Sequence, residues 1–103
     1  MMNFNQLVRQ AQQMQRKVNK LKNEFDEKEF EFASQQDLIT GKINGNLEII
    51  DLKINKDLLD EENKEMLEDL LVVTINENIA KIAKEKEDTI NNATNGVDVS
   101  AFL

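Results

Sequence analysis

The sequence predicts an α+β domain with a long N-terminal helix, a three-stranded antiparallel sheet and a long C-terminal helix, in the order α-β-β-β-α. Three observations predict it. Residues 4–25 repeat apolar side chains at helical spacing, residues 29–54 contain strand-forming runs around an Asn-Gly pair, and residues 60–90 form an amphipathic segment that begins with acids. The 103 residues suit one domain, which we expect over residues 1–95, with a loosely ordered C-terminal tail over residues 96–103.

The first helix has a recognisable start and a continuous apolar stripe. Asn3 is placed to cap the helix, and Gln6 occupies the reciprocal capping-box position. The stripe alternates spacings of three and four residues and consists of Phe4, Leu7, Ala11, Met14, Val18, Leu21 and Phe25. Such a seven-residue repeat faces another helix, either within the subunit or across a subunit interface. At 1.5 Å per residue the helix is about 35 Å long, so we expect it to project from the sheet.

The middle of the chain predicts three strands, with residues 34–37 connecting the first two. The strands are expected over residues 29–32, 38–43 and 47–54. Asn44-Gly45 predicts a two-residue hairpin turn in which both residues take positive φ.

Alternation along the hairpin predicts which face of the sheet is buried. The residues expected on the core face are Ile39, Gly41, Ile43, Ile50, Leu52 and Ile54. Ile49 beside Ile50 breaks the alternation, which indicates either a bulge or a region where both faces are covered.

The second helix is predicted to start at Asp60 as its N-cap, with Glu61 and Glu62 suiting the positive end of the helix dipole. The apolar residues that follow cover more than one helix face, so we expect them to contact both the sheet and a partner subunit. This dimer or core stripe consists of Met66, Leu67, Leu70, Leu71 and Val73. The protein is therefore expected to be a homodimer. A narrower stripe is placed to pair with the first helix and consists of Ile79, Ile82, Ala83 and Ile90.

Charge is distributed unevenly along the chain. The net charge of −7 by itself argues against a polyanionic partner, but residues 1–23 contain five bases and no acid. Residues 24–103 contain the other eight bases and all 20 acids. The first helix is therefore a basic arm on an acidic protein.

The bases of the first helix form a line along the side away from the apolar stripe. Arg9, Gln13, Arg16 and Lys20 are spaced by four, three and four residues, and Lys17 flanks them. A solvated face is the structural alternative, but acids at i±3 or i±4 are missing before Glu24. The predicted nucleic-acid-binding residues are Arg9, Gln13, Arg16, Lys17, Lys20 and Lys22. In the second helix, by contrast, Lys81 and Lys84 have acids at helical spacing, and we expect these lysines to be paired.

The residue inventory argues against catalysis. The chain has no His, Cys or Tyr, its serines are Ser34 and Ser100, and it lacks a glycine-rich phosphate loop or a calcium-binding loop. We therefore expect no enzyme activity, metal, cofactor or small-molecule substrate. No apolar stretch approaches the roughly 20 residues needed to span a bilayer, and the start lacks a signal-peptide pattern, so we expect a cytoplasmic protein without membrane contact.

Four segments carry a resemblance to a known family. They read QLVRQAQQMQRKV over residues 6–18, INGNLEI over 43–49, LL over 58–59 and KEMLEDLL over 64–71. With the predicted element order, they make the chain similar to the YbaB/EbfC family of small bacterial nucleoid-associated proteins. The resemblance implies a tweezer-like homodimer whose helical arms bind double-stranded DNA in the nucleoid without catalysis. It extends the DNA-binding role, as weaker candidates, to Lys81, Lys84 and Lys86.

Binding through arm lysines and arginines predicts little sequence readout, because phosphate contacts position a protein while base-edge contacts give specificity. An alternative function remains open. The dimer would then be an adaptor or scaffold that docks onto the DNA replication or repair machinery through its acidic surface.

Overall fold

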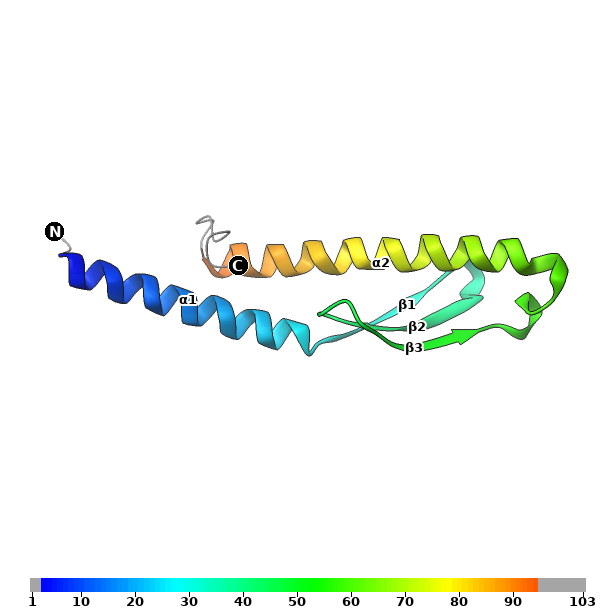
Figure 1. Cartoon of the computed structure of the whole chain (residues 1–103), viewed down its shortest axis with the longest axis horizontal. Coiled ribbons are helices and arrows are strands. Elements are labelled where there is room, and N and C mark those ends of the chain that lie inside the picture. The colour runs from blue at the N-terminus through cyan, green and yellow to red at the C-terminus, as the bar shows by residue number, and fades with distance from the viewer. Residues whose placement is uncertain (1–2, 95–103) are drawn as a thin grey trace.

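The computed structural model describes residues 3–94 and confirms the α-β-β-β-α order (Figure 1). Its helices are α1 (Phe4–Asp26) and α2 (Lys64–Ala93), and its strands are β1 (Glu29–Ala33), β2 (Ile39–Asn44) and β3 (Ile49–Ile54). Short 3₁₀ turns lie at Gln35–Asp37, Lys56–Leu58 and Glu61–Asn63. The molecule is elongated and extends over 70 × 18 × 17 Å. The tail expected over residues 96–103 lies outside the described residues.

The predicted capping box at the start of α1 is confirmed. The Asn3 side chain accepts a hydrogen bond from the Gln6 backbone N–H at 2.8 Å, and the Gln6 side chain accepts one from the Asn3 backbone N–H at 3.2 Å. Each residue therefore satisfies a backbone donor that would otherwise lack a partner at the helix start.

The sheet has the strand order β1-β2-β3, and both pairings are antiparallel. α2 lies along one face of this sheet and continues beyond it beside α1 (Figure 1). The main core lies between sheet and helices and contains Phe25, Phe32, Ile39, Ile43, Leu58 and Ile82. The register shifts between Lys42 and Ile43, which places Ile49, rather than Ile50, opposite Ile43. The irregularity indicated by the Ile49-Ile50 pair is thus a β-bulge.

The hairpin between β2 and β3 forms as predicted, but the predicted type of turn is wrong. Neither Asn44 nor Gly45 has positive φ; Leu47 does, at 64°. The Leu47 N–H donates to the Asn44 carbonyl at 2.9 Å, and the Asn44 N–H donates to the Glu48 carbonyl at 2.9 Å. The connection is therefore a three-residue loop that ends in a left-handed residue, a common hairpin form.

Gly45 is required in this loop for close approach rather than for its φ. A Cβ atom at this position would lie 1.8 Å from the carbonyl oxygen of Phe25, at the end of α1. The Gly45 N–H also donates to the Lys28 carbonyl at 2.9 Å. The hairpin tip is thus pressed against the junction between α1 and β1.

The start of the second helix differs from the prediction by one turn. Asp60 caps the 3₁₀ turn Glu61–Asn63, where its side chain accepts a hydrogen bond from the Asn63 N–H at 2.8 Å. The α-helical geometry of α2 begins only at Lys64. The predicted acids therefore lie in a 3₁₀ lead-in, which is frequent at helix N-termini.

α2 pairs with only part of the α1 stripe. Val18 and Ile90 are buried against each other, with Met14 packed on them. Phe4 and Leu7, at the start of the stripe, are 76% and 55% exposed. Of the two alternatives for the stripe, packing within the subunit therefore holds for its second half, while its first half extends past the end of α2.

Candidate nucleic-acid interface

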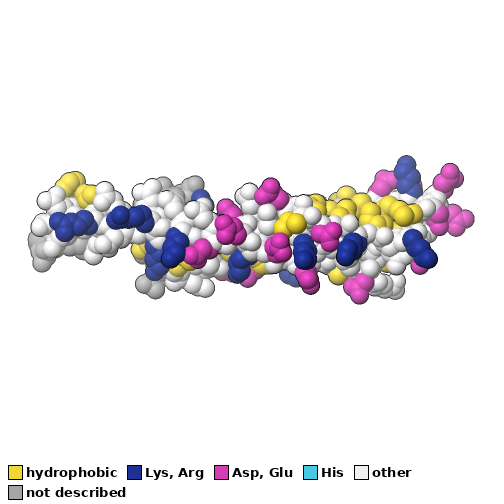
Figure 2. Space-filling view, turned by 90° about the horizontal axis from the view of Figure 1, so that it is seen from below, with side chains coloured by type: hydrophobic (Ala, Val, Ile, Leu, Met, Phe, Trp, Pro, Cys, Tyr) yellow, Lys and Arg dark blue, Asp and Glu magenta, His cyan; other side chains and the backbone are white. Residues whose placement is uncertain are grey.

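The predicted DNA-contacting line lies on an exposed part of α1. Arg9, Gln13, Arg16 and Lys20 are all exposed. The first and last of them are 11 residues apart in one continuous helix, which corresponds to about 16 Å along its axis. Figure 2 shows that, on the face in view, the end of the molecule formed by the start of α1 carries basic side chains and no acidic ones.

The three predicted lysines of α1 differ in their surroundings. The Lys17 Nζ donates to the Ala93 carbonyl at 2.9 Å, which joins the middle of α1 to the end of α2. Lys20 lies 3.9 Å from Glu24, but both side chains are more than half exposed, so the pair offsets little of the charge. Lys22 is half-buried. Arg9 and Arg16 are therefore the bases of the line with the most open surroundings.

The predicted pairing of the α2 lysines is only partly correct. Lys84 does lie 3.5 Å from Asp88, at the expected spacing. For Lys81 the expectation was wrong, because within residues 3–94 no ion pair joins it to Glu77 or Glu85. Exposed side chains at helical spacing gain too little from pairing to hold one geometry, so spacing alone does not ensure contact.

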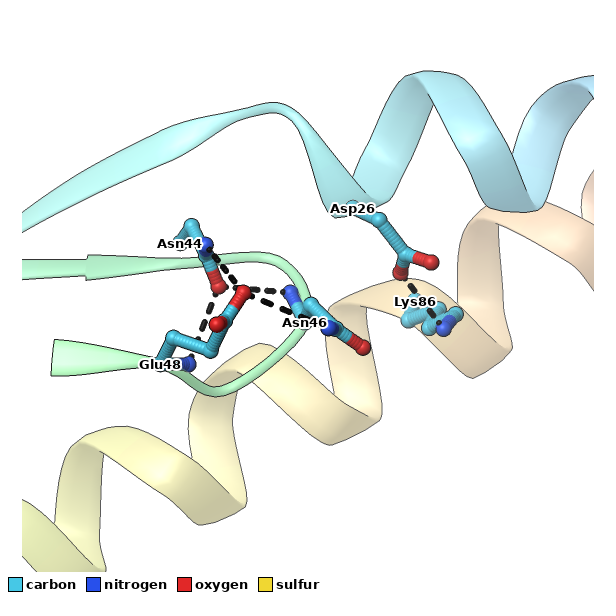
Figure 3. A network of polar contacts seen from close by, with 5 residues as sticks. All are labelled: Asp26, Asn44, Asn46, Glu48 and Lys86. Atoms are coloured by element: carbon cyan, nitrogen blue, oxygen red, sulfur yellow. Dashed lines mark hydrogen bonds and ion pairs between the residues drawn. The ribbon is translucent and has the colours of Figure 1, made fainter. Parts of the chain in front are cut away.

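Lys86 is engaged between the helices. Its Nζ lies 2.8 Å from a carboxylate oxygen of Asp26, and the two side chains are 27% and 31% exposed. Asp26 is the last residue of α1, so the pair ties the end of α1 to α2 (Figure 3). No local pattern points to this contact, because the partners are 60 positions apart in the chain.

A polar network closes the hairpin tip close to this ion pair (Figure 3). The Asn44 side chain accepts hydrogen bonds from the backbone N–H groups of Asn46 and Glu48, at 3.0 and 2.9 Å. The Glu48 carboxylate accepts hydrogen bonds from the side-chain amides of Asn44 at 3.0 Å and Asn46 at 3.3 Å. These amide donors, with Asn44 contributing more, lower the pKa of Glu48 below its ordinary value.

A second surface of interest is apolar and lies on α2 and β3. Of the predicted dimer or core stripe, Leu67, Leu70 and Leu71 pack against the core of the same chain. Met66 and Val73 are instead exposed, at 44% and 52%. The expectation that Ile50 and Leu52 face the core was wrong, because they are 48% and 41% exposed at the edge strand β3. The other exposed apolar residues near this stripe are Ile49, Leu59 and Val72. The doublets Ile49-Ile50 and Val72-Val73 indicate this exposed surface in the sequence. Two adjacent apolar residues cannot both face one core, so at least one of each doublet must lie outside it.

Apolar side chains also gather in one area of the face shown in Figure 2, toward the end of the molecule away from the N-terminus. A concentration of this kind is typical of protein contact surfaces.

A groove of about 820 Å³ runs between α2 and the segment that follows β1. Its apolar lining includes Met66, Leu70 and Val73. Acidic side chains line it as well: Glu62, Glu65, Asp69 and Glu77. The groove thus combines apolar contact area with negative charge.

The described part of the chain also has bearing on metal binding and on membrane insertion. Residues 3–94 contain no group of three or more side chains that could hold a metal ion. Neither α1 nor α2 is long and apolar enough to cross a bilayer.

Comparison with known proteins gives a consistent result. Residues 1–97 match the YbaB/EbfC DNA-binding family. A nucleoid-associated protein of Malacoplasma penetrans is 46% identical over 86 residues, which cover 84% of this chain and 90% of that protein. One from Clostridium novyi is 34% identical over 102 residues, covering 99% of this chain and 90% of that protein. Among solved structures, an uncharacterized protein of Helicobacter pylori shares the fold, with a TM-score of 0.79 at 22% identity over 91% of this chain and 99% of that one.

Proposed function

Because the chain belongs to the YbaB/EbfC DNA-binding family, we propose that it is a nucleoid-associated protein that binds double-stranded DNA in the bacterial cytoplasm. The related proteins of Malacoplasma penetrans and Clostridium novyi carry the name nucleoid-associated protein. The resemblance noted in the sequence is thereby confirmed.

The observation that carries the proposal at the level of residues is the open basic line of α1. Arg9 and Arg16 are exposed, and the first 23 residues contain no acid to offset them. A line of guanidinium and ammonium groups on a rigid helix suits phosphate oxygens, which are the strongest acceptors that duplex DNA presents. We propose that Gln13, Lys17, Lys20 and Lys22 extend this contact. Lys81 and Lys84 of α2 remain weaker candidates.

Lys86 has the weakest case among the candidate bases. Its ammonium group already contacts Asp26 at 2.8 Å, so a phosphate would have to displace a partly buried carboxylate. We propose that its main role is to hold α2 against α1.

The active form is proposed to be a homodimer with the shape of tweezers. Support comes from the exposed apolar surface of α2 and β3, which includes Val72 at 60% exposure, and from Leu59 in the segment between them, at 64% exposure. Burying such side chains against a second copy removes apolar area from water, which is worth about 25 cal/mol per Å². A homodimer with paired basic arms would also contact more phosphates than one subunit.

Catalysis has no place in this proposal. The chain lacks His and Cys, and the exposed arginines of α1 are guanidinium groups suited to binding anions rather than to acting as nucleophiles or bases. Neither a cofactor nor a small-molecule substrate is required for phosphate contact.

A protein adaptor is the second candidate function, and one observation favours it. The groove lined by Glu62, Glu65, Asp69 and Glu77 would suit a basic, amphipathic segment of a partner from the replication or repair machinery. In that case the protein would bind its partner without needing the arm bases.

Mobility shift on duplex DNA at two salt concentrations tests the main proposal. Binding should occur at low salt, weaken steeply as salt rises, and differ little between unrelated sequences. A chain that stays unbound on every duplex at low salt would favour the adaptor.

A further inference from the structure

The first half of α1 carries an apolar stripe that no element among residues 3–94 covers. Residues 4–13 are all exposed, and three of them belong to the stripe: Phe4, Leu7 and Ala11. Farther along the helix, the same repeat buries Val18 against Ile90. The exposed half therefore has the pattern of a helix–helix seam without its second helix.

The end of α2 sets the length of the uncovered stripe. The Lys17 Nζ donates to the Ala93 carbonyl at 2.9 Å, so α2 ends close to the level of Lys17. Beyond this level, α1 continues past α2 toward its own N-terminus (Figure 1). From Lys17 to Phe4 the helix rises about 20 Å, which leaves room for a second helix of about three turns.

The positions that flank the exposed stripe carry no charge. In a two-helix seam, the flanking side chains are those at the e and g positions of the seven-residue repeat. With Phe4 at position a, these residues are Val8, Gln10 and Gln15. Arg9 and Arg16 fall at position f, on the side farthest from the seam. A second copy of the same helix can therefore approach the stripe without bringing like charges together.

An antiparallel arrangement gives two such stripes a matched register. With the partner helix reversed about the level of Arg9, Leu7 faces the partner's Ala11 and Phe4 faces the partner's Met14. Each large side chain at the centre thus meets a small one, while methionine adapts to irregular gaps at the ends. We propose that residues 4–14 of two copies of the chain pair in this way, as antiparallel helices.

The partner helix comes from a different dimer. Antiparallel pairing makes two molecules, each 70 Å long, extend in opposite directions from their N-terminal ends. The apolar surface of α2 and β3, which is proposed to hold the homodimer together, lies toward the other end of each molecule (Figure 2). The two apolar surfaces are then too far apart to meet in the same pair of chains. Because a dimer has two arms, this pairing would join dimers into rows.

The contact is too small to hold free dimers together tightly. Two helices that overlap by about 15 Å bury less than the roughly 1,200 Å² typical of stable complexes. Dimers that bind the same duplex are neighbours, which raises the effective concentration of one arm at another. DNA should therefore promote the pairing, and this part of the inference rests on the proposed DNA binding. Arg9 of each arm points away from the partner, so paired arms can hold two stretches of duplex on opposite sides.

Disulfide trapping tests the register, because the natural chain has no cysteine. One chain carries Leu7→Cys and the other Ala11→Cys, and the two are mixed with and without long duplex DNA. The matched control replaces the second chain with Gln12→Cys, which places its thiol at a similar level but away from the seam. Non-reducing electrophoresis measures the crosslinked chains. At high protein concentration we expect the disulfide to form about tenfold faster than in the control, and faster still when duplex is added.

The outcomes separate pairing of the arms from binding of DNA. Equal rates with Ala11→Cys and Gln12→Cys would overturn the pairing, even where a mobility shift shows normal DNA binding. A preference for Ala11→Cys in a protein that shifts no duplex would support the pairing and refute the proposed function. Crosslinking that is fastest in Leu7→Cys alone would indicate parallel helices and overturn the antiparallel register.

Cooperative binding provides a second measurement. Leu7→Gln removes the central apolar contact and keeps the helix propensity, and because Leu7 is exposed in the single chain, the fold should survive. We expect this variant to bind a duplex that holds one dimer with unchanged affinity. On a duplex that holds many dimers, its affinity should fall several-fold, because neighbouring dimers no longer pair. Asn5→Gln, away from the stripe, is the control and should match the natural chain on both duplexes. Unchanged binding of the long duplex by Leu7→Gln would contradict the proposal.

Discussion

The Nζ of Lys86 in α2 lies 2.8 Å from a carboxylate oxygen of Asp26, the last residue of α1. Both side chains are less than one-third exposed, so this is the most protected of the ion pairs among residues 3–94. It lies next to the hairpin tip, where α1, the sheet and α2 meet (Figure 3). The ion pair therefore joins α1 to α2 at the point where the two helices extend beyond the sheet.

Removing this pair should reduce stability. In a double-mutant cycle with Asp26→Asn and Lys86→Gln, we expect a coupling free energy of about 1 kcal/mol, because partial burial limits screening by water. Urea unfolding of the four proteins measures it. The exposed pair Lys84 and Asp88 is the control and should give less than about 0.5 kcal/mol. Equal coupling in both cycles would contradict a special role for Lys86.

The basic line should control DNA affinity. Changing Arg9, Arg16 and Lys20 together to Gln should weaken binding to all duplexes alike and reduce the log-affinity salt slope by about one unit per lost contact. Glutamine keeps the helix propensity, so folding should survive. Titrations of labelled duplex at several salt concentrations provide the measurement.

Two controls accompany the triple variant. The first control changes Lys53, Lys56 and Lys64 to Gln. It removes the same amount of charge at positions outside the arms, so the salt slope should stay the same. The second control changes Lys81 and Lys84 to Gln and tests α2. We expect it to lose less DNA affinity than the α1 variant. If the α2 variant loses binding while the α1 variant keeps it, DNA contacts the other helix.

The apolar surface of α2 should hold the homodimer together. Val72→Asp with Val73→Asp would place two charges in the proposed interface, where desolvation is costly, and should shift the protein toward its 11.9 kDa monomer. Asn92→Asp adds a charge to an exposed position near the other end of the same helix, away from Val72 and Val73, and is the control. Sedimentation at micromolar concentration distinguishes the forms. Wild-type protein that sediments as a monomer would refute the dimer itself.

Glu48 should titrate below its ordinary pKa of 4.5, because amides of Asn44 and Asn46 donate to the carboxylate. A lowered folded-state pKa stabilises the fold above the unfolded pKa, and this contribution is lost as pH falls through the folded value. NMR titration should show the pKa of Glu48 rising in Asn44→Ala. A pKa that stays the same in this variant would exclude the amide donors as the cause.

Gly45→Ala should destabilise the fold. The added Cβ would lie 1.8 Å from the Phe25 carbonyl oxygen, so the hairpin must shift away from α1. Overpacking of this kind costs about 1–3 kcal/mol. Asn46→Ala, in the same loop, keeps its backbone N–H for Asn44 and should cost less in urea unfolding. A similar decrease in the free energy of unfolding in the two variants would argue against the steric explanation.

The sequence predicted the elements well where the signal is local. Asn3 and Gln6 define the start of α1 because a capping box involves neighbouring residues. The sequence did not predict the type of turn. In isolation the Asn44-Gly45 motif favours a two-residue loop. In the structure Gly45 contacts the end of α1, and Leu47 takes the positive φ. Tertiary contact decided the type of loop.

Prediction of the candidate site has the same limit. Helical spacing correctly identified Arg9 and Arg16 as an exposed line, because exposure on a projecting helix depends on that helix alone. It could not identify Asp26 as the partner of Lys86, since that contact depends on how α2 lies against α1. It also could not tell which apolar residues of α2, such as Leu70 and Val73, would be covered.

The separation of charge along a molecule 70 Å in length makes it an electric dipole. A polyanion exerts a torque on such a body, which turns the basic end of α1 toward the surface and the acidic end, with Glu61 and Glu62, away from it. Because the Debye length is about 8 Å at physiological ionic strength, this alignment operates only in the last stage of approach. The acidic character of the whole chain therefore contributes to orientation, as it repels the wrong end of the molecule while the arms make contact.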